Sequence, residues 1–418
     1  MGVWLRGGLL VAYSMENFRR LAASLAVAAL IVSSAFARDY RLTVAPVGVD
    51  RAAQVIVVKL PPDARGATSA RGSDGVYPLQ VDSDGTARLV VPAQKAGQSL
   101  EFQLQAAPAK ASGGVAVTSD RQRVRVLVAG RPAFDYQMDR EALPRADIAP
   151  EFKRAGYIHP VYSPAGKIVT DDYPSNHVHH HGIWSPWTKT SFQGRSPDFW
   201  NMQAKTGAED FVALDRTWSG PVHGGFESRL KMVDLSGPAP VTVLNETWRV
   251  TAYLVAGGGG VPATVFDLEV TQTCATNDPL LLPKYHYGGF GFRGAAEWNG
   301  ESGAVFLTSE GETDRVKGNA TRGRWCYLGG QIGGAVAGTA VLGHPGNFRA
   351  PQPMRLHPNM PYLSYVPQQL GDFAIEPGKP YVVRFRFVAS DGAPDQRAID
   401  AYWNGYALQP EVKLEAAR

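Results

Sequence analysis

The sequence has few cysteines and few charged residues, and both features exclude classes of protein. Only two cysteines, Cys274 and Cys326, occur in 418 residues, so at most one disulfide forms and stability comes mainly from a hydrophobic core. A disulfide and two buried thiols are equally compatible with the sequence. Charged residues make up 19% and the net charge is +4. Because basic and acidic residues are mixed along the chain, we expect no nucleic-acid partner.

The chain also lacks the short motifs that bind nucleotides or activate a serine. It contains no G-x-S-x-G, no P-loop, no H-E-x-x-H, and no G-x-G-x-x-G that opens a predicted helix. These motifs build nucleophile elbows, phosphate cradles and zinc protease sites. Their absence disfavours serine-hydrolase, nucleotide and nicotinamide chemistry.

Residues 1–37 follow the pattern of an export signal. Arg19 and Arg20 precede an apolar run over residues 21–32, and Ala35-Phe36-Ala37 forms an A-x-A cleavage site. The apolar run is shorter than the roughly 20 residues that span a bilayer. We therefore expect a signal peptide, 1–37, that is cleaved after Ala37, and a periplasmic or extracellular protein with no later membrane span.

Turn residues are frequent, with 45 glycines and 30 prolines, which indicates many short strands. Strand patterns over 54–60, 87–92, 99–105 and 121–128 predict a small β-sandwich accessory domain, 38–130. Alternation over 241–253, 263–272 and 380–388 predicts a large antiparallel β-sandwich, 131–410. One helix is expected near the C-terminus, since Pro394 suits a first helical turn and the apolar residues after it follow helical spacing.

Four of the nine histidines lie in the string SNHVHHHGIW: His177, His179, His180 and His181. In an extended segment His177, His179 and His181 would project to one side and His180 to the other. Because imidazoles titrate near neutral pH, His179 and His180 are candidate catalytic acids and bases. An H-x-H pair can instead bind a metal ion, so His177 and His179 are also candidate ligands for Zn, Cu or Fe.

Carboxylates and aromatic rings supply further candidates. Asp198 precedes Trp200, whose ring could stack on the apolar face of a sugar or could belong to the core. Glu246 shares a predicted strand face with apolar residues, where a carboxylate needs a partner or has a raised pKa. Asp198 and Glu246 are therefore candidate catalytic carboxylates. Four residues in glycine-rich or turn segments are candidates for substrate binding: His286, Arg293, His344 and Asn347.

Several strings form a specific set over residues 131–405. They are YIHPVY at 157–162, Asp172, Pro174 and Gly182 around the histidines, DFW at 198–200, GGFGFR at 288–293 and GHPGNFRAPQPMRLHP at 343–358. This set resembles an uncharacterised bacterial family labelled PmoA, or methane oxygenase PmoA. The resemblance implies association with carbohydrate-degrading systems. The chain departs from the pattern at His181, where the family has an arginine.

The predicted sandwich also resembles the galactose-mutarotase-like supersandwich of sugar-active enzymes. Together these features predict an exported carbohydrate-active protein that acts on a small sugar or an oligosaccharide, as an epimerase, lyase or hydrolase does. In this hypothesis a histidine removes or donates a proton, and a carboxylate of the protein serves as the opposite acid or base. Arg293 binds a carboxylate or hydroxyl of the sugar. A metal-dependent oxidoreductase or oxygenase and a non-catalytic sugar-binding envelope protein are the alternatives.

Overall fold

The computed structural model describes residues 39–109, 113–255 and 262–416. Strands hold 47% and helices 9% of the residues, so the protein is an all-β sandwich, as predicted. The predicted signal peptide, 1–37, lies outside the described residues. Within the described residues, no helix is long and apolar enough to cross a bilayer.

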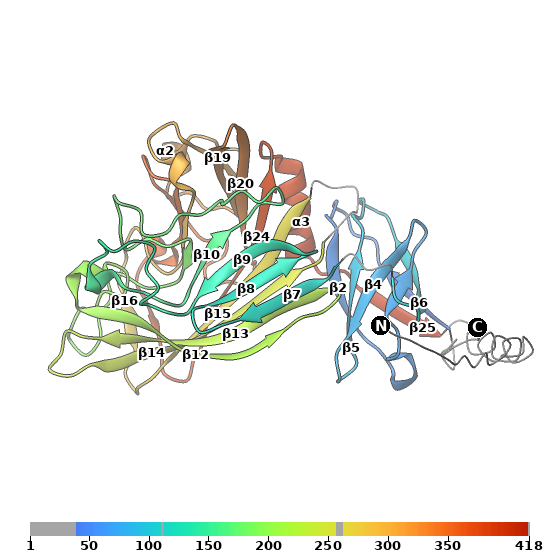
Figure 1. Ribbon diagram of the computed structural model, residues 1–418, viewed down its shortest axis with the longest axis horizontal. Coiled ribbons are helices and arrows are strands. Elements are labelled where there is room, and N and C mark those ends of the chain that lie inside the picture. Colours follow the sequence, from blue (N-terminus) through green and yellow to red (C-terminus); the bar gives the residue numbers. More distant parts are fainter. Residues whose placement is uncertain (1–38, 110–112, 256–261, 417–418) are drawn as a thin grey trace, which may run out of the picture.

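Two eight-stranded antiparallel sheets form the large sandwich (Figure 1). The first contains β7 (Val115–Ser119), β8 (Arg123–Val128), β9 (Arg131–Gln137), β10 (Tyr157–Val161), β11 (Ile183–Trp184), β17 (Gly291–Arg293), β21 (Met354–Leu356) and β22 (Tyr362–Tyr365). The second contains β12 (Gly207–Trp218), β13 (His223–Asp234), β14 (Val241–Tyr253), β15 (Ala263–Cys274), β18 (Ala304–Thr308), β19 (Trp325–Ile332), β20 (Ala335–Gly343) and β24 (Tyr381–Asp391). The strand orders are β21-β22-β17-β11-β10-β9-β8-β7 and β12-β13-β14-β15-β24-β20-β19-β18.

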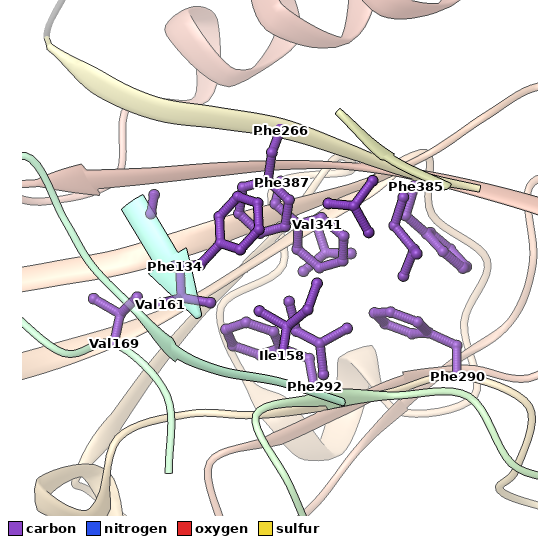
Figure 2. Close-up of a cluster of buried hydrophobic side chains, with 14 of the residues drawn as sticks. Phe134, Ile158, Val161, Val169, Phe266, Phe290, Phe292, Val341, Phe385 and Phe387 are labelled. Atoms are coloured by element: carbon purple, nitrogen blue, oxygen red, sulfur yellow. The ribbon is translucent and has the colours of Figure 1, made fainter. Parts of the chain in front are cut away.

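The main hydrophobic core lies between these two sheets. In Figure 2 labelled side chains of both sheets point toward one another, and Phe266 lies among them. Its ring centroid is 4.4 Å from that of Phe134 in the first sheet and 4.7 Å from that of Phe387. Alternation explains this placement, because every second residue of β14, β15 and β24 faces inward. The strands predicted at 241–253, 263–272 and 380–388 are thus confirmed.

A third, smaller sheet forms the N-terminal module. Its strands are β1 (Tyr40–Val44), β2 (Gln54–Lys59), β3 (Ser69–Arg71), β4 (Val76–Val81), β5 (Thr86–Val91), β6 (Leu100–Gln105) and β25 (Val412–Ala416). They run in the order β2-β5-β4-β3-β6-β1-β25 around a core of their own. In Figure 1, β25 from the C-terminal part of the chain lies among the blue strands.

The boundary of the N-terminal module differs from the one predicted at residue 130. The strand predicted at 121–128 is β8, which pairs with β7 and β9 of the large sandwich, so the described N-terminal strands of the module end with β6. At the other end β25, which lies beyond residue 410, pairs with β1. Alternation shows which residues face inward, but not which strand is the neighbour.

The remaining elements connect and cover the sheets. They are the helices α2 (Arg315–Gly318) and α3 (Gln396–Ala407), the two-stranded sheet β16 (Leu280–Leu282) with β23 (Phe373–Ile375), and 3-10 turns at Pro62–Ala64, Pro150–Phe152, Met202–Ala204, Ala296–Trp298 and Pro367–Leu370. The predicted C-terminal helix is α3. Its N-cap is Asp395, which accepts from the backbone N–H groups of Arg397 and Ala398, so Pro394 precedes the helix instead of starting it. Cys274 and Cys326 are free thiols, which settles the alternative left open above.

Phe266 provides the test of this core. Replacing it by alanine removes a fully buried ring between two others, and we expect the free energy of unfolding to fall by about 3–5 kcal/mol. Val212→Ala on β12 is the control, because that side chain is 47% exposed and its loss leaves no cavity. Urea denaturation of both variants measures the difference. Equal stability of the two would contradict the packing described here.

Candidate functional site

Three neighbouring strands of the first sheet bring together the groups of the candidate site. The N–H of Arg293, at the end of β17, donates to the carbonyl of Gly182 just before β11, at 2.9 Å. On its other side Arg293 pairs with Tyr362, the first residue of β22. The loop that carries the histidines leads into β11, so it lies next to Arg293. Residues more than 100 positions apart thus meet at one end of β11, β17 and β22.

The histidine loop is a series of turns. The N–H of His177 donates to Pro174 O and that of His180 to His177 O, while Tyr173 N–H donates to His180 O. The loop is closed by Gly182, where a Cβ would lie 2.4 Å from the carbonyl oxygen of Ile158. The expected extended segment is therefore wrong, because local hydrogen bonds fold it back on itself.

This folding places His177, His179 and His180 together. Their ring centroids lie 4.9 Å (His177 to His180), 4.7 Å (His179 to His180) and 5.7 Å (His177 to His179) apart. His357, from the loop after β21, lies 6.2 Å from His177. We call these four residues the imidazole cluster. The alternation that assigned His180 to the opposite side from His177 does not hold.

Burial keeps the cluster uncharged at neutral pH. It lowers the pKa of His179 to about 3 and that of His357 to about 4, and it lowers the pKa of His177 and, strongly, that of His180. The positive charge of Arg293 further lowers the pKa of His177 and His180. A neutral imidazole has one free lone pair that accepts hydrogen bonds, although the lowered pKa makes each ring a weaker base than an exposed histidine.

Aromatic rings form the wall behind the cluster. The ring of His180 lies 5.1 Å from Trp184, 5.1 Å from Tyr362 and 6.1 Å from Trp200. Both indoles fit because Gly291 has no side chain: a Cβ there would lie 2.8–2.9 Å from them. Trp200 is only 1% exposed. It therefore supports the imidazoles from behind and does not present an open face to a sugar.

Arg293 lies beneath the cluster and is fully buried. Its Nη2 donates to Asn176 Oδ1 at 3.1 Å and to Asn299 Oδ1 at 2.8 Å. Its Nε and Nη1 have no hydrogen-bond partner among the described residues, and neither do Nδ1 of His177 and Nδ1 of His180. Burial lowers the pKa of Arg293 to about 10, so it keeps its charge at neutral pH.

His181 separates from the other histidines of the string. Its Nδ1 lies 2.7 Å from Oδ1 of Asp172, whose Oδ2 accepts from the hydroxyl of Tyr157 at 3.0 Å. The imidazole stacks on Tyr157 at 4.2 Å and is fully buried. Burial raises the pKa of Asp172 to about 6 and strongly lowers that of His181. This pair was not predicted, although Asp172 and His181 both stood in the strings that carry the resemblance.

The two predicted catalytic carboxylates lie in hydrogen-bond networks outside the imidazole cluster. Asp198 accepts from the backbone N–H groups of Trp200 and Asn201, from the Asn201 amide and from the Thr188 hydroxyl, so it stabilises a turn. Glu246 faces the interior and accepts from Trp248 Nε1 and Gln272 Nε2. Burial raises its pKa. Asp198 lies within electrostatic reach of His179 and raises the pKa of that ring, but hydrogen bonds within the protein hold both carboxylates.

Three predicted binding residues lie away from the cluster. His286 is exposed and packs on Tyr285 at 4.4 Å. His344 lines a cavity of about 220 Å³ beside α3 and contacts Tyr406 at 5.1 Å. Asn347 accepts from the N–H of Arg384 and donates to its carbonyl, so its amide is used by the backbone. Turn composition favoured these residues, but tertiary contacts placed them elsewhere.

The metal alternative lacks a complete ligand set. Within residues 39–109, 113–255 and 262–416, no group of three His, Cys, Asp or Glu side chains is arranged to hold a metal ion. His177 and His179 are close, but no third ligand converges with them. Structural and catalytic zinc sites use at least three protein ligands.

Comparison with known families assigns most of the chain to one family. Residues 123–404 match the model of a family of unknown function, DUF6807. The chain belongs to this family. The matched region contains the whole imidazole cluster, Arg293 and β8, but not the N-terminal module. The PmoA label is not part of that description, and no curated protein matches the chain.

The cluster predicts how acid affects stability. His179 has a folded pKa of about 3, below its unfolded value, so the folded state is favoured above about pH 6.5 and loses this advantage as the pH falls toward 3. Solvent screens a partly exposed ring, which reduces the effect. Between about pH 7 and about pH 4 we expect the free energy of unfolding to fall by about 1–2 kcal/mol less in His179→Gln than in wild type. Urea denaturation at several pH values measures it.

His286→Gln is the matched control for this experiment. Its imidazole is exposed, and burial lowers its pKa less than that of His179, so the pH dependence of that variant should stay close to wild type. A His179→Gln protein that loses as much stability in acid as wild type would show that His179 is not held neutral.

Proposed function

We propose that the protein is an exported carbohydrate-active enzyme that moves a proton on a sugar with neutral imidazoles. The observation that carries the proposal lies in the imidazole cluster. The ring centroids of His177, His179 and His180 lie within 5.7 Å of one another, and the rings are uncharged at neutral pH. Nδ1 of His177 and Nδ1 of His180 have no hydrogen-bond partner among the described residues. A neutral imidazole within hydrogen-bond reach of a substrate proton is a general base.

The cluster can supply both the acid and the base. His180 is 4% exposed and is surrounded by Trp184 and Tyr362, so it acts in an environment of low polarity. The ring centroid of His177 lies 4.9 Å from that of His180, and His177 is partly exposed. In this proposal a neutral ring removes a proton as the base and, once protonated, gives it back as the acid, in the roles first predicted for Asp198 and Glu246. Epimerase-, lyase- and hydrolase-like reactions all need an acid and a base.

Turnover on a panel of sugars and glycosides tests the proposal. We expect His180→Gln to lower kcat/KM by about 10²- to 10⁴-fold, because it removes the base and leaves a side chain that still forms hydrogen bonds. His344→Gln should match wild type, since His344 lies beside α3 and away from the cluster. Binding without turnover, with all variants alike, would instead identify a non-catalytic sugar-binding protein.

Export can be tested separately from activity. The sequence of residues 19–37 predicts that the exported protein begins at Arg38, because Ala35-Phe36-Ala37 fits signal peptidase. Mass spectrometry of the N-terminus after fractionation of a Gram-negative host measures this. An Ala37→Leu variant should remain uncut, because a large residue blocks the small-residue site, whereas Ser33→Thr should be processed normally. An intact N-terminus on wild-type protein in the cytoplasm would refute export.

A further inference from the structure

The guanidinium of Arg293 carries a buried charge that the described protein only partly compensates. Of its three nitrogens, only Nη2 has hydrogen-bond partners, and both of these are neutral amide oxygens, of Asn176 and Asn299. The nearest carboxylate, Asp171, is 4.0 Å from Nε, and its Oδ1 accepts from the N–H of Asp172. Buried charges in proteins are ordinarily paired and fully hydrogen-bonded, since desolvation costs several kcal/mol.

Another buried arginine of this protein shows what full compensation looks like. Arg386 donates from Nε and Nη2 to the two oxygens of Asp267, at 2.7 and 2.9 Å. Arg293 has no such carboxylate, since Asp171 lies 4.0 Å from its Nε. Its Nη2, which together with Nε would form the fork that binds both oxygens of a carboxylate, is used by the two amides, so Nη1 remains to bind an anion.

The surroundings of Arg293 also favour an anion. Its charge lowers the pKa of His177, His180 and His357, which shows that these rings lie within its electrostatic reach. All three are uncharged, so they add no negative charge to balance it. His177, Asn176 and Asn299 are partly or fully exposed and form the outer edge, with Arg293 and His180 beneath them.

Building on the proposed function, we propose that the substrate is an acidic sugar whose carboxylate pairs with Arg293 while its ring lies against His177 and His180. The class is that of the uronic acids, in which a pyranose bears a carboxylate on C5. Nη1 of the guanidinium would bind a carboxylate oxygen, and the free Nδ1 atoms of the imidazoles would face the ring.

This pairing places chemistry at the carbon next to the carboxylate. A carboxylate bound by a cation holds the electron pair that is left when an imidazole removes the C5 proton. If that imidazole gives its proton to water and water returns a proton to C5 on the opposite face, the product is the C5 epimer. If instead the C4–O bond breaks, the electron pair forms a C4–C5 double bond and the leaving oxygen takes the proton that the imidazole removed from C5. Neither course requires an oxidant, a reductant or a co-reactant.

Binding of uronates and their esters tests the inference without any mutation. Titration calorimetry of the full chain compares D-glucuronate and D-galacturonate with their methyl esters, which keep the ring but lose the charge. We expect at least one acid to bind about 10- to 100-fold tighter than its ester, as charge-assisted hydrogen bonds predict. Acetate, which has the carboxylate but no ring, should bind more weakly than that acid.

Variants then test whether Arg293 causes the preference for the acid over its ester. Arg293→Gln should abolish the preference for the acid. Asn299→Ala, which loses the hydrogen bond from Arg293 and those with Asn176 and Ala296 O at the exposed edge, should reduce it. Arg216→Gln is the matched control, because Arg216 is an exposed arginine paired with Glu227 on β12 and β13. Thermal melts establish folding, and if Arg293→Gln does not fold, the comparison of Asn299→Ala with Arg216→Gln decides.

The outcomes separate this inference from the proposed function. Equal binding of acid and ester, or acetate binding as tightly as the uronate, overturns the inference. So does binding confined to neutral sugars, while a histidine-dependent turnover of those sugars would leave the proposed function intact. Failure of every acidic and neutral sugar to bind or react would refute both.

Discussion

The site depends on the pairing of three short strands, β11, β17 and β22. Their register sets Gly182, Arg293 and Tyr362 side by side, and it fixes where the histidine loop must leave the sheet. A shift by one residue would turn Arg293 toward the other face of the sheet, because side chains alternate along a strand. Gly182 and Gly291 belong to the same constraint, since a side chain at either would collide with its neighbours.

Keeping imidazoles and a guanidinium away from water has a thermodynamic cost that the rest of the fold offsets. The aromatic core around Phe266 and the paired ion of Arg386 with Asp267 stabilise the sandwich, while the imidazole cluster and Arg293 weaken it. A group of unsatisfied polar atoms that survives in a folded protein is typical of a binding or catalytic site. The cluster therefore differs from the satisfied network around Glu246.

Sequence patterns predicted what depends on local periodicity. Alternation identified β14, β15 and β24, and helical spacing identified α3, since each pattern reflects a single face. The clustering of histidines indicated the loop that carries the candidate site. Its conformation could not be predicted, because three backbone hydrogen bonds fold it into turns. Tyr362 reaches the site through strand pairing, Asn299 follows a 3-10 turn, and Asp198 is engaged by its own turn. None of these effects leaves a local signal.

The pairing of β1 with β25 joins Tyr40 to Ala416. During synthesis β1 can pair early with β6, but its other edge has no neighbour until β25 and nearly the whole chain have emerged. The sandwich, whose strands lie between these two, can form first and hold the two ends near each other. The module is then the last part to close, and its completion reports that the polypeptide has been made in full through β25.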